Sequence, residues 1–309
     1  MKKNFLLLAT MLIATVVMLS SCRNYDELNM DSEKKEEVKF TSNIATVNAP
    51  LRVTGNTWEK DDAIGIYMFE EATTNVVEGM ANVEYTTQSE GETGSFTPAG
   101  KIIYFPDNGN KVRFMSYHPY KTEVTTDGNV YKADVSNQTK QTAIDLLYSF
   151  NKTALFDKTV ANKTVPLVFD HQLTKVYVNV KAGAGLTNDD LENIEIHFAG
   201  LSTKADFNLI DGSLSSYSTV TDITPLSITA KDDYKVSYEA IVLPEENAPT
   251  TAQIVFDLKN GDLFTWNFNT PLVAATKYTY NVTVNRSGIV VEATINEWKN
   301  GGESNINAE

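Results

Sequence analysis

Cysteine is nearly absent from this sequence of 309 residues, which contains only Cys22. One cysteine cannot form a disulfide within a single chain, so the fold must be stabilised by buried surface rather than by cross-links. Basic residues are also few, because 26 Lys and Arg stand against 40 Asp and Glu, a formal net charge of −14. Nucleic acids and anionic lipid headgroups attract positive charge. The charge balance therefore argues against both as partners.

Histidine is scarce as well, with three residues, His118, His171 and His197. None lies in a His-x-His or His-Glu-x-x-His spacing, which would bring two ring nitrogens to one metal ion. Each falls in or beside a strand-like run. We therefore expect structural histidines, each with a hydrogen-bond partner, and no metal site.

The motifs of common active sites are missing too. The sequence has no Gly-x-Ser-x-Gly elbow, no Gly-x-Gly-x-x-Gly and no phosphate-binding loop. Neighbouring side chains on a strand point to opposite faces, so the acid pairs Asp61-Asp62 and Glu245-Glu246 are expected in turns. Carboxylates distant in the sequence could still meet in space, as in a glycosidase. We expect no catalytic residue and no cofactor.

Long apolar runs are confined to the stretch from Phe5 to Leu19, which follows Lys2 and Lys3. A charged start and a short apolar run are typical of a signal peptide and fall short of a comfortable bilayer span. The next residues, Leu19-Ser20-Ser21-Cys22, resemble the lipobox of bacterial lipoproteins. That resemblance implies cleavage after residue 21 and acylation, such as palmitoylation, at Cys22. Several acyl chains anchor a protein firmly, since each buried CH₂ contributes ~0.8 kcal/mol.

Residues 22–37 are polar and charged, so we expect a tether between the lipid and the fold. Asp26 and Glu27 follow the cysteine closely. An acidic cluster at this place resembles the surface-export signal of Bacteroidales-type lipoproteins, and a solvated linker is the alternative.

The rest of the chain shows the period-two alternation of half-buried β-strands, with Gly, Pro, Asn and Asp between the runs. Amphipathic helical patterns are hard to find, and only 188–193 is expected to form a helical turn. The pair Asn260-Gly261 predicts a two-residue type I′ hairpin turn. Strands are expected at 38–40, 44–53, 64–68, 83–87, 102–105, 112–117, 130–135, 145–149, 175–180, 194–198, 254–258, 263–268 and 278–284.

A stretch without period, 151–163, is rich in Lys, Thr and Asn and suggests a domain boundary. We expect one β-sandwich over residues 38–158 and a second, with a C-terminal tail, over residues 159–309. Each would contain about seven strands.

Several short runs, taken in order, resemble the Bacteroidales-type fimbrillin family. The N-terminal runs are Trp58 with Asp62-Ala63-Ile64-Gly65-Ile66-Tyr67, Tyr104-Phe105-Pro106, Phe114-Met115-Ser116-Tyr117-His118-Pro119-Tyr120 and Asp145-Leu146-Leu147-Tyr148. The later runs are Val168-Phe169-Asp170-His171-Gln172-Leu173-Thr174-Lys175-Val176, Leu243-Pro244, Tyr278-Thr279-Tyr280-Asn281-Val282 and Ile295-Asn296-Glu297-Trp298. The likeness covers nearly the whole chain after the signal peptide.

The resemblance implies an all-β protein with two transthyretin-like Greek-key β-sandwich domains in tandem and no catalysis. It also implies export as a surface lipoprotein of the outer membrane and assembly with other subunits into adhesive fimbriae. The expected partners are other fimbrial subunits, the outer membrane through the lipid anchor, and a ligand on a host or bacterial surface.

A surface glycan-binding lipoprotein serving polysaccharide uptake is the alternative. Such a protein needs two or three coplanar aromatic rings on one solvent-exposed face. Trp58, Trp266 and Trp298 could form such a platform, but each adjoins an apolar strand, so we expect them in the core.

Two further expectations concern assembly. In fimbrillins an arginine between the first strand and the tryptophan-containing segment is cut by a protease, and Arg52 holds the matching place. Loss of the first strand would open a groove that a neighbour's extended segment can fill. The stretch 288–296 qualifies as the donor, since Ile289, Val291, Ala293 and Ile295 share one face. The alternative is that this stretch is simply the last strand of the second sandwich.

Overall fold

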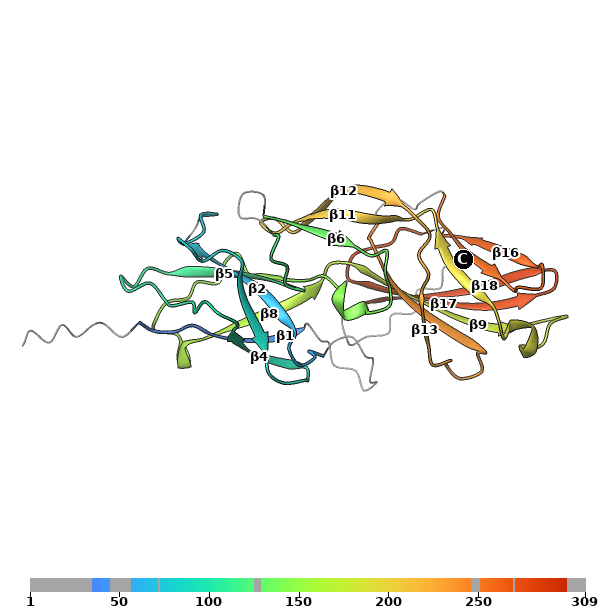
Figure 1. Ribbon diagram of the computed structural model, residues 1–309, viewed down its shortest axis with the longest axis horizontal. Coiled ribbons are helices and arrows are strands. Elements are labelled where there is room, and N and C mark those ends of the chain that lie inside the picture. Colours follow the sequence, from blue (N-terminus) through green and yellow to red (C-terminus); the bar gives the residue numbers. More distant parts are fainter. Residues whose placement is uncertain are drawn as a thin grey trace, which may run out of the picture. The chain divides into compact units, whose positions relative to one another are not determined.

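The computed structural model describes residues 35–44, 57–71, 73–124, 129–245, 251–268 and 270–298. These residues form eighteen β-strands and three short 3₁₀ helices, which confirms the expected all-β class (Figure 1). The expected signal peptide, most of the expected tether, Cys22 and Arg52 lie outside the described residues.

Seven strands form a closed barrel in the order β1-β4-β3-β2-β5-β7-β8. Every neighbouring pair is antiparallel except β1 and β8, which are parallel. The barrel strands are β1 (Lys39–Ile44), β2 (Ala63–Glu70), β3 (Val83–Thr87), β4 (Thr93–Pro98), β5 (Val112–His118), β7 (Leu147–Phe150) and β8 (Thr164–His171).

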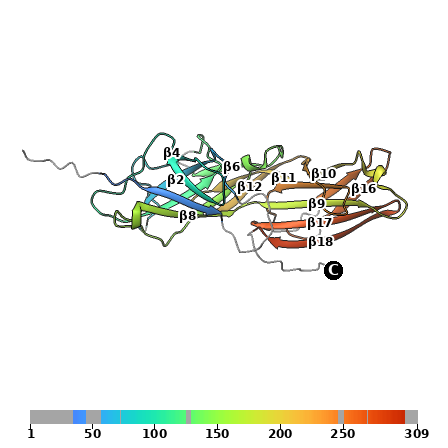
Figure 2. The same ribbon diagram turned by 90° about the horizontal axis from the view of Figure 1, so that it is seen from below.

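The remaining strands form three open sheets, two of which lie on the part of the chain after β8 (Figure 2). The five-stranded sheet contains β13 (Leu226–Ile228), β14 (Val236–Val242), β9 (Thr174–Ala182), β17 (Thr276–Asn285) and β18 (Gly288–Glu297) in that order. The second sheet contains β10 (Glu195–Ala199), β15 (Gln253–Asp257) and β16 (Leu263–Asn267). The third contains β12 (Ser213–Val220), β11 (Ser202–Asn208) and β6 (Val130–Asp134).

Two hydrophobic clusters form the core between these strands. One fills the barrel, where Phe40 packs edge-to-face on Tyr85 and Phe114 at centroid distances of 5.2 and 5.1 Å. The other includes the inner face of the five-stranded sheet, for instance Tyr278 and Tyr280. Alternating residues with one apolar face per strand produce such layers, since each face must be covered by another element.

Strand β2 belongs to both clusters, so the expectation of a half-buried strand there is wrong. Ile64, Ile66 and Met68 face the barrel interior, as the alternation predicts. Tyr67 and Phe69, on the opposite face, are also fully buried because they pack in the second cluster. The barrel wall is therefore covered on both sides along this strand.

Backbone pairing crosses the point where the sequence suggests a boundary. Strand β8 follows residue 158, yet it pairs with β1 and β7 in the barrel. Strand β6 precedes that residue and pairs with β11, residue 205 opposite residue 133. The β1–β8 and β6–β11 pairs thus join strands that are far apart in the chain.

Local expectations have mixed outcomes. The helical turn is confirmed as a 3₁₀ helix, Asn188–Leu191, capped reciprocally by Thr187 and Asp190. The hairpin between β15 and β16 is confirmed, but its turn is wider than two residues because Leu258 still pairs with Asp262. Positive φ occurs at Lys259 and Gly261.

Candidate functional site

Strand β1 closes the barrel by joining β4 to β8. It pairs with β4 on one side, Phe40 opposite Phe96, and with β8 on the other, Phe40 opposite Val165. Both edges of a strand of only six residues are therefore engaged. If β1 left, two neighbouring strands would each expose a row of unpaired backbone groups.

The side chains of β1 alternate as the sequence predicts. Phe40, Ser42 and Ile44 point inward and are at most 3% exposed, and Val38 just before the strand is fully buried. Lys39 and Asn43, on the other face, are exposed. Burial of a Phe or Ile side chain contributes about 1.5–3 kcal/mol, so the apolar inward residues anchor β1 in the barrel.

Ser42 is the exception among the inward residues of β1. Its hydroxyl is buried and has no hydrogen-bond partner among the described residues. Gly94 on β4 lies opposite Ser42. A Cβ at Gly94 would lie 2.6 Å from a ring carbon of Phe96 and 2.9 Å from the Ser42 hydroxyl oxygen. The Phe96 ring and the Ser42 hydroxyl therefore leave no room for a side chain at residue 94.

Trp58 belongs to the cluster inside the barrel and is 1% exposed. Its backbone exchanges hydrogen bonds with Gly91, 2.8 and 3.0 Å long. Its ring makes edge contacts with Phe96, His118 and Phe169 at centroid distances of 5.1 to 5.4 Å. Arg52, the expected processing residue, belongs to the intervening residues, which lie outside the described ranges.

Strand β18 carries the expected donor residues and lies at one edge of the five-stranded sheet. It pairs with β17 over its full length, from Gly288 opposite Asn285 to Glu297 opposite Thr276. Ile289, Val291, Ala293 and Ile295 pack against the second cluster but stay partly exposed. The stretch is thus placed as the last strand of its own sheet, the alternative that the sequence left open. This position does not itself test donation to a neighbour.

Trp298 fixes the end of β18. Its ring is 5% exposed and stacks on His171 with centroids 3.9 Å apart and an interplanar angle of 10°. The Nδ1 of His171 lies 3.0 Å from a carboxylate oxygen of Asp145. The C-terminal end of β18 is therefore joined to the end of the barrel strand β8.

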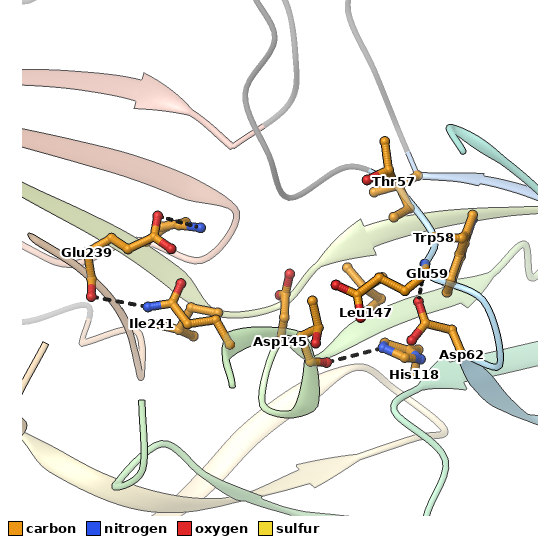
Figure 3. A pocket seen from close by; sticks show the side chains of 13 residues that line it. Thr57, Trp58, Glu59, Asp62, His118, Asp145, Leu147, Glu239 and Ile241 are labelled. Atoms are coloured by element: carbon orange, nitrogen blue, oxygen red, sulfur yellow. Dashed lines mark hydrogen bonds and ion pairs between the residues drawn. The ribbon is translucent and has the colours of Figure 1, made fainter. Parts of the chain in front are cut away.

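A cavity of about 190 Å³ lies at the Ile44 end of β1 (Figure 3). Its ionisable lining residues are Glu59, Asp62, His118, Asp145, Lys175 and Glu239. Lys175 Nζ lies 3.1 Å from a Glu239 carboxylate oxygen, and Asp62 accepts a 2.7 Å hydrogen bond from the backbone N–H of Glu59. These contacts tie the side chains to the fold.

The structure places the three histidines in three different surroundings. The His118 ring nitrogens lie 2.9 and 3.3 Å from the carbonyl oxygens of Ala63 and Thr142. His197 Nε2 lies 3.6 Å from an Asp222 carboxylate oxygen. With Asp145 beside His171, two of the histidines have the predicted hydrogen-bond partners, whereas the carboxylate beside His197 lies beyond hydrogen-bond distance. Within the described ranges, no three His, Cys, Asp or Glu residues are arranged to hold a metal ion.

The tryptophans lie in the core, which confirms that expectation. Trp58 and Trp298 are buried, and Trp266 is partly buried against Phe268 and Tyr280. Asp61 and Asp62 form the turn before β2, as expected. No helix in the described part of the chain combines the length and apolar character needed to cross a membrane.

These features define an all-β protein. The histidines and tryptophans that the sequence singles out contact neighbouring residues within its fold. A family model described as fimbrillin-like matches residues 52–298, and the chain belongs to this family. Over 320 aligned positions it is 35% identical to a Bacteroides uniformis protein named “Putative fimbrium subunit Fim1C”, with 100% of each chain covered.

Solved structures resemble it as well. A Bacteroides uniformis crystal structure, described as a “putative cell adhesion protein”, superposes with a TM-score of 0.70 at 32% identity, covering 87% of this chain and 99% of that one. A Bacteroides ovatus structure with the same description has a TM-score of 0.67 at 22% identity and the same coverage. The second likeness concerns the fold alone.

Proposed function

We propose that this protein is a structural and adhesive subunit of cell-surface fimbriae, which assembles with other fimbrial subunits. Family membership and the 35% identity to a protein named for a fimbrium support the role. The names of the relatives favour this function over glycan capture for polysaccharide uptake. The buried tryptophans favour it too, because a sugar platform needs exposed rings.

The subunit is exported as a lipoprotein that carries its acyl chains at Cys22 and reaches the outer surface of the outer membrane. The sequence before Cys22 supports this step. Substitution Cys22→Ala should leave an uncleaved or soluble precursor, measured by membrane fractionation and intact mass. Recovery of this variant with the outer membrane at wild-type level would contradict the lipid anchor.

Cleavage at Arg52 then separates β1 and the lipid anchor from the rest of the subunit, since both precede Arg52 in the chain. The single observation that carries this proposal is the place of β1, a six-residue strand paired on both sides in a closed barrel. Its removal opens one gap between β4 and β8, and a neighbour's strand can fill it through backbone hydrogen bonds.

The two-domain organisation with transthyretin-like Greek-key sandwiches also belongs to this proposal. The separate cluster inside the barrel and the five-stranded sheet that begins with β9 support two domains. The pairing of β8 with β1 favours a boundary between His171 and Thr174 over one at residue 158.

Filaments and their N-terminal sequence test the assembly proposal. Electron microscopy of native material should show filaments whose subunits start at Val53. Arg52→Ala should abolish both the filaments and the N-terminus at Val53. Lys60→Ala, which changes the next basic residue, should leave both unchanged. Filaments whose subunits start at the acylated cysteine would contradict processing, and single particles alone would contradict the fimbrial role.

A further inference from the structure

A groove of about 580 Å³ lies beside β12. Its lining comes from β11 and β12, from the residues that follow β14 and from those that precede β17. We propose that this groove binds an extended polypeptide segment of a partner protein that presents an arginine between apolar side chains, with the guanidinium against Glu245 and Tyr217. This inference rests on the adhesive role proposed above and gives the chemistry of the ligand.

Glu245 gives the groove its charge. Among the described residues that line the groove there is no Lys or Arg and no other Asp or Glu. Asp211, which precedes the lining residue Gly212, is exposed and adds a second negative charge nearby. Complementary charge steers binding and excludes like-charged partners. The groove therefore selects a cationic group.

The Glu245 carboxylate is held in place but has few hydrogen bonds. Its backbone exchanges hydrogen bonds of 2.7 and 3.0 Å with Leu272. One carboxylate oxygen accepts a hydrogen bond of 3.3 Å from the backbone N–H of Ser202. Burial raises the pKa of this carboxyl, because desolvation disfavours its charged form. A guanidinium would supply two parallel charge-assisted hydrogen bonds to it, which a lysine ammonium does not.

Tyr217 reaches the groove from an irregular part of β12. Between the pairs Lys204–Ser218 and Asp206–Ser215, β12 has one residue more than β11, which is a β-bulge. Ser216 in this bulge has a φ of 56°, a left-handed conformation that is uncommon outside glycine. Bulges recur beside functional sites, where they re-aim a side chain. The Tyr217 ring is 41% exposed, and an arginine stacks favourably on such a ring.

The surroundings of the groove favour apolar neighbours on both sides of the arginine. Val273 lines the groove, Val220 lies opposite the lining residue Ser202, and both valines are exposed. The Val273 backbone is fixed, since its carbonyl accepts a 2.7 Å hydrogen bond from the Thr174 hydroxyl and its N–H donates a 3.1 Å hydrogen bond to the Tyr278 hydroxyl. Exposed apolar residues gathered at one place are typical of interaction sites.

An extended ligand fits because β12 is the edge of its sheet. Among the described strands it pairs with β11 alone, which separates it from β6 (Figure 1). An edge strand presents unpaired backbone groups, and a polypeptide segment can pair with them while its side chains enter the groove. A sugar offers no such row of alternating donors and acceptors.

The experiment selects ligands from a phage library of short random peptides on the full-length Cys22→Ala chain. Selected peptides should carry an arginine between apolar residues. Glu245→Gln should weaken the binding of the best peptide at least about tenfold in calorimetric titration. Glu292→Gln, which removes an exposed carboxylate that does not line the groove, should leave it unchanged. Selection of no peptide, or of peptides that bind Glu245→Gln as well as the wild-type chain, would overturn the proposal.

A change in the peptide tests the same contact without altering the protein. Citrulline in place of the arginine removes the charge and should also weaken binding at least about tenfold. Equal binding of the two peptides would overturn the ion pair with Glu245.

Tyr217 is tested by two variants whose folding is checked by thermal melting. Tyr217→Phe keeps the ring and should keep the affinity, whereas Tyr217→Ala should lower it about fivefold. Full affinity in a folded Tyr217→Ala chain would overturn the contact with the ring. Binding on a glycan array that depends on Glu245, without peptide binding, would overturn a polypeptide as the ligand. Native material without filaments would instead contradict the fimbrial role, so the two failures are distinguishable.

Discussion

The strands β1 and β18 lie at opposite ends of the described chain and are held in different ways. Strand β1 has partners on both edges, and its inward side chains are almost completely buried. Strand β18 has a partner on one edge only, among the described residues, and its inward side chains are partly exposed. The difference indicates that β18 can leave its sheet more easily than β1 can leave the barrel. The gap left by β1 would be the one that most needs to be filled.

Loss of an edge strand leaves a shorter but continuous sheet, because its former neighbour becomes the new edge. Loss of a strand from a closed barrel leaves two facing edges and an open core. By this reasoning β18 is suited to leave and β1 marks a site suited to receive. Stability measurements on matched residues of the two strands can sharpen or break this contrast.

The largest expected effect is at Phe40. Phe40→Ala removes a fully packed ring beside Tyr85 and Phe114, and should lower the free energy of unfolding of the uncut chain by about 3–5 kcal/mol. Val291→Ala, on the inward face of β18, should cost about 1 kcal/mol because the residue is partly exposed. Chemical denaturation of the Cys22→Ala chain measures both. Equal losses would contradict the contrast between the two strands.

A closer comparison uses the same residue type at the last inward position of each strand. Ile44 is 3% exposed in the barrel, and Ile295 is partly exposed at the sheet edge. Ile44→Ala should cost about 2–5 kcal/mol, the range for a buried Ile, and Ile295→Ala should cost less than half of that. Denaturation curves of the two variants measure both losses. A larger loss at Ile295 would show that β18 is an indispensable part of its own sheet.

Alternation in the sequence predicts most strands because it depends on adjacent residues alone. The runs at 64–68, 112–117 and 278–284 all lie within strands. Strand β4 escapes this reasoning, since Phe96 is its only large apolar residue and Gly94 weakens a strand pattern. The fit of Gly94 depends on Phe96 and Ser42, and Ser42 belongs to a strand some fifty residues away, a distance no local pattern spans.

The candidate site is less predictable than the strands. The pattern at 288–296 indicates a strand with one apolar face but cannot say whether its outer edge is paired. Likewise, the parallel pairing of Phe40 with Val165 joins residues far apart in sequence, so local alternation gives no sign of it. The cavity residues Asp62, His118 and Glu239 come from three separate segments, and only the folded chain brings them to the lining of one cavity.

The smallest expected effect is at Ser42, the one polar residue on the inward face of β1. Because this hydroxyl is buried without a partner, Ser42→Ala should stabilise the uncut chain by about 1 kcal/mol. Ser42→Val, the matched control, adds volume beside Gly94 and Phe96 and should destabilise it by about 1–3 kcal/mol. Denaturation midpoints measured in parallel decide the sign of each change. A loss of stability in Ser42→Ala would mean that the hydroxyl makes a favourable interaction, and alanine would then have no advantage at this position of the barrel.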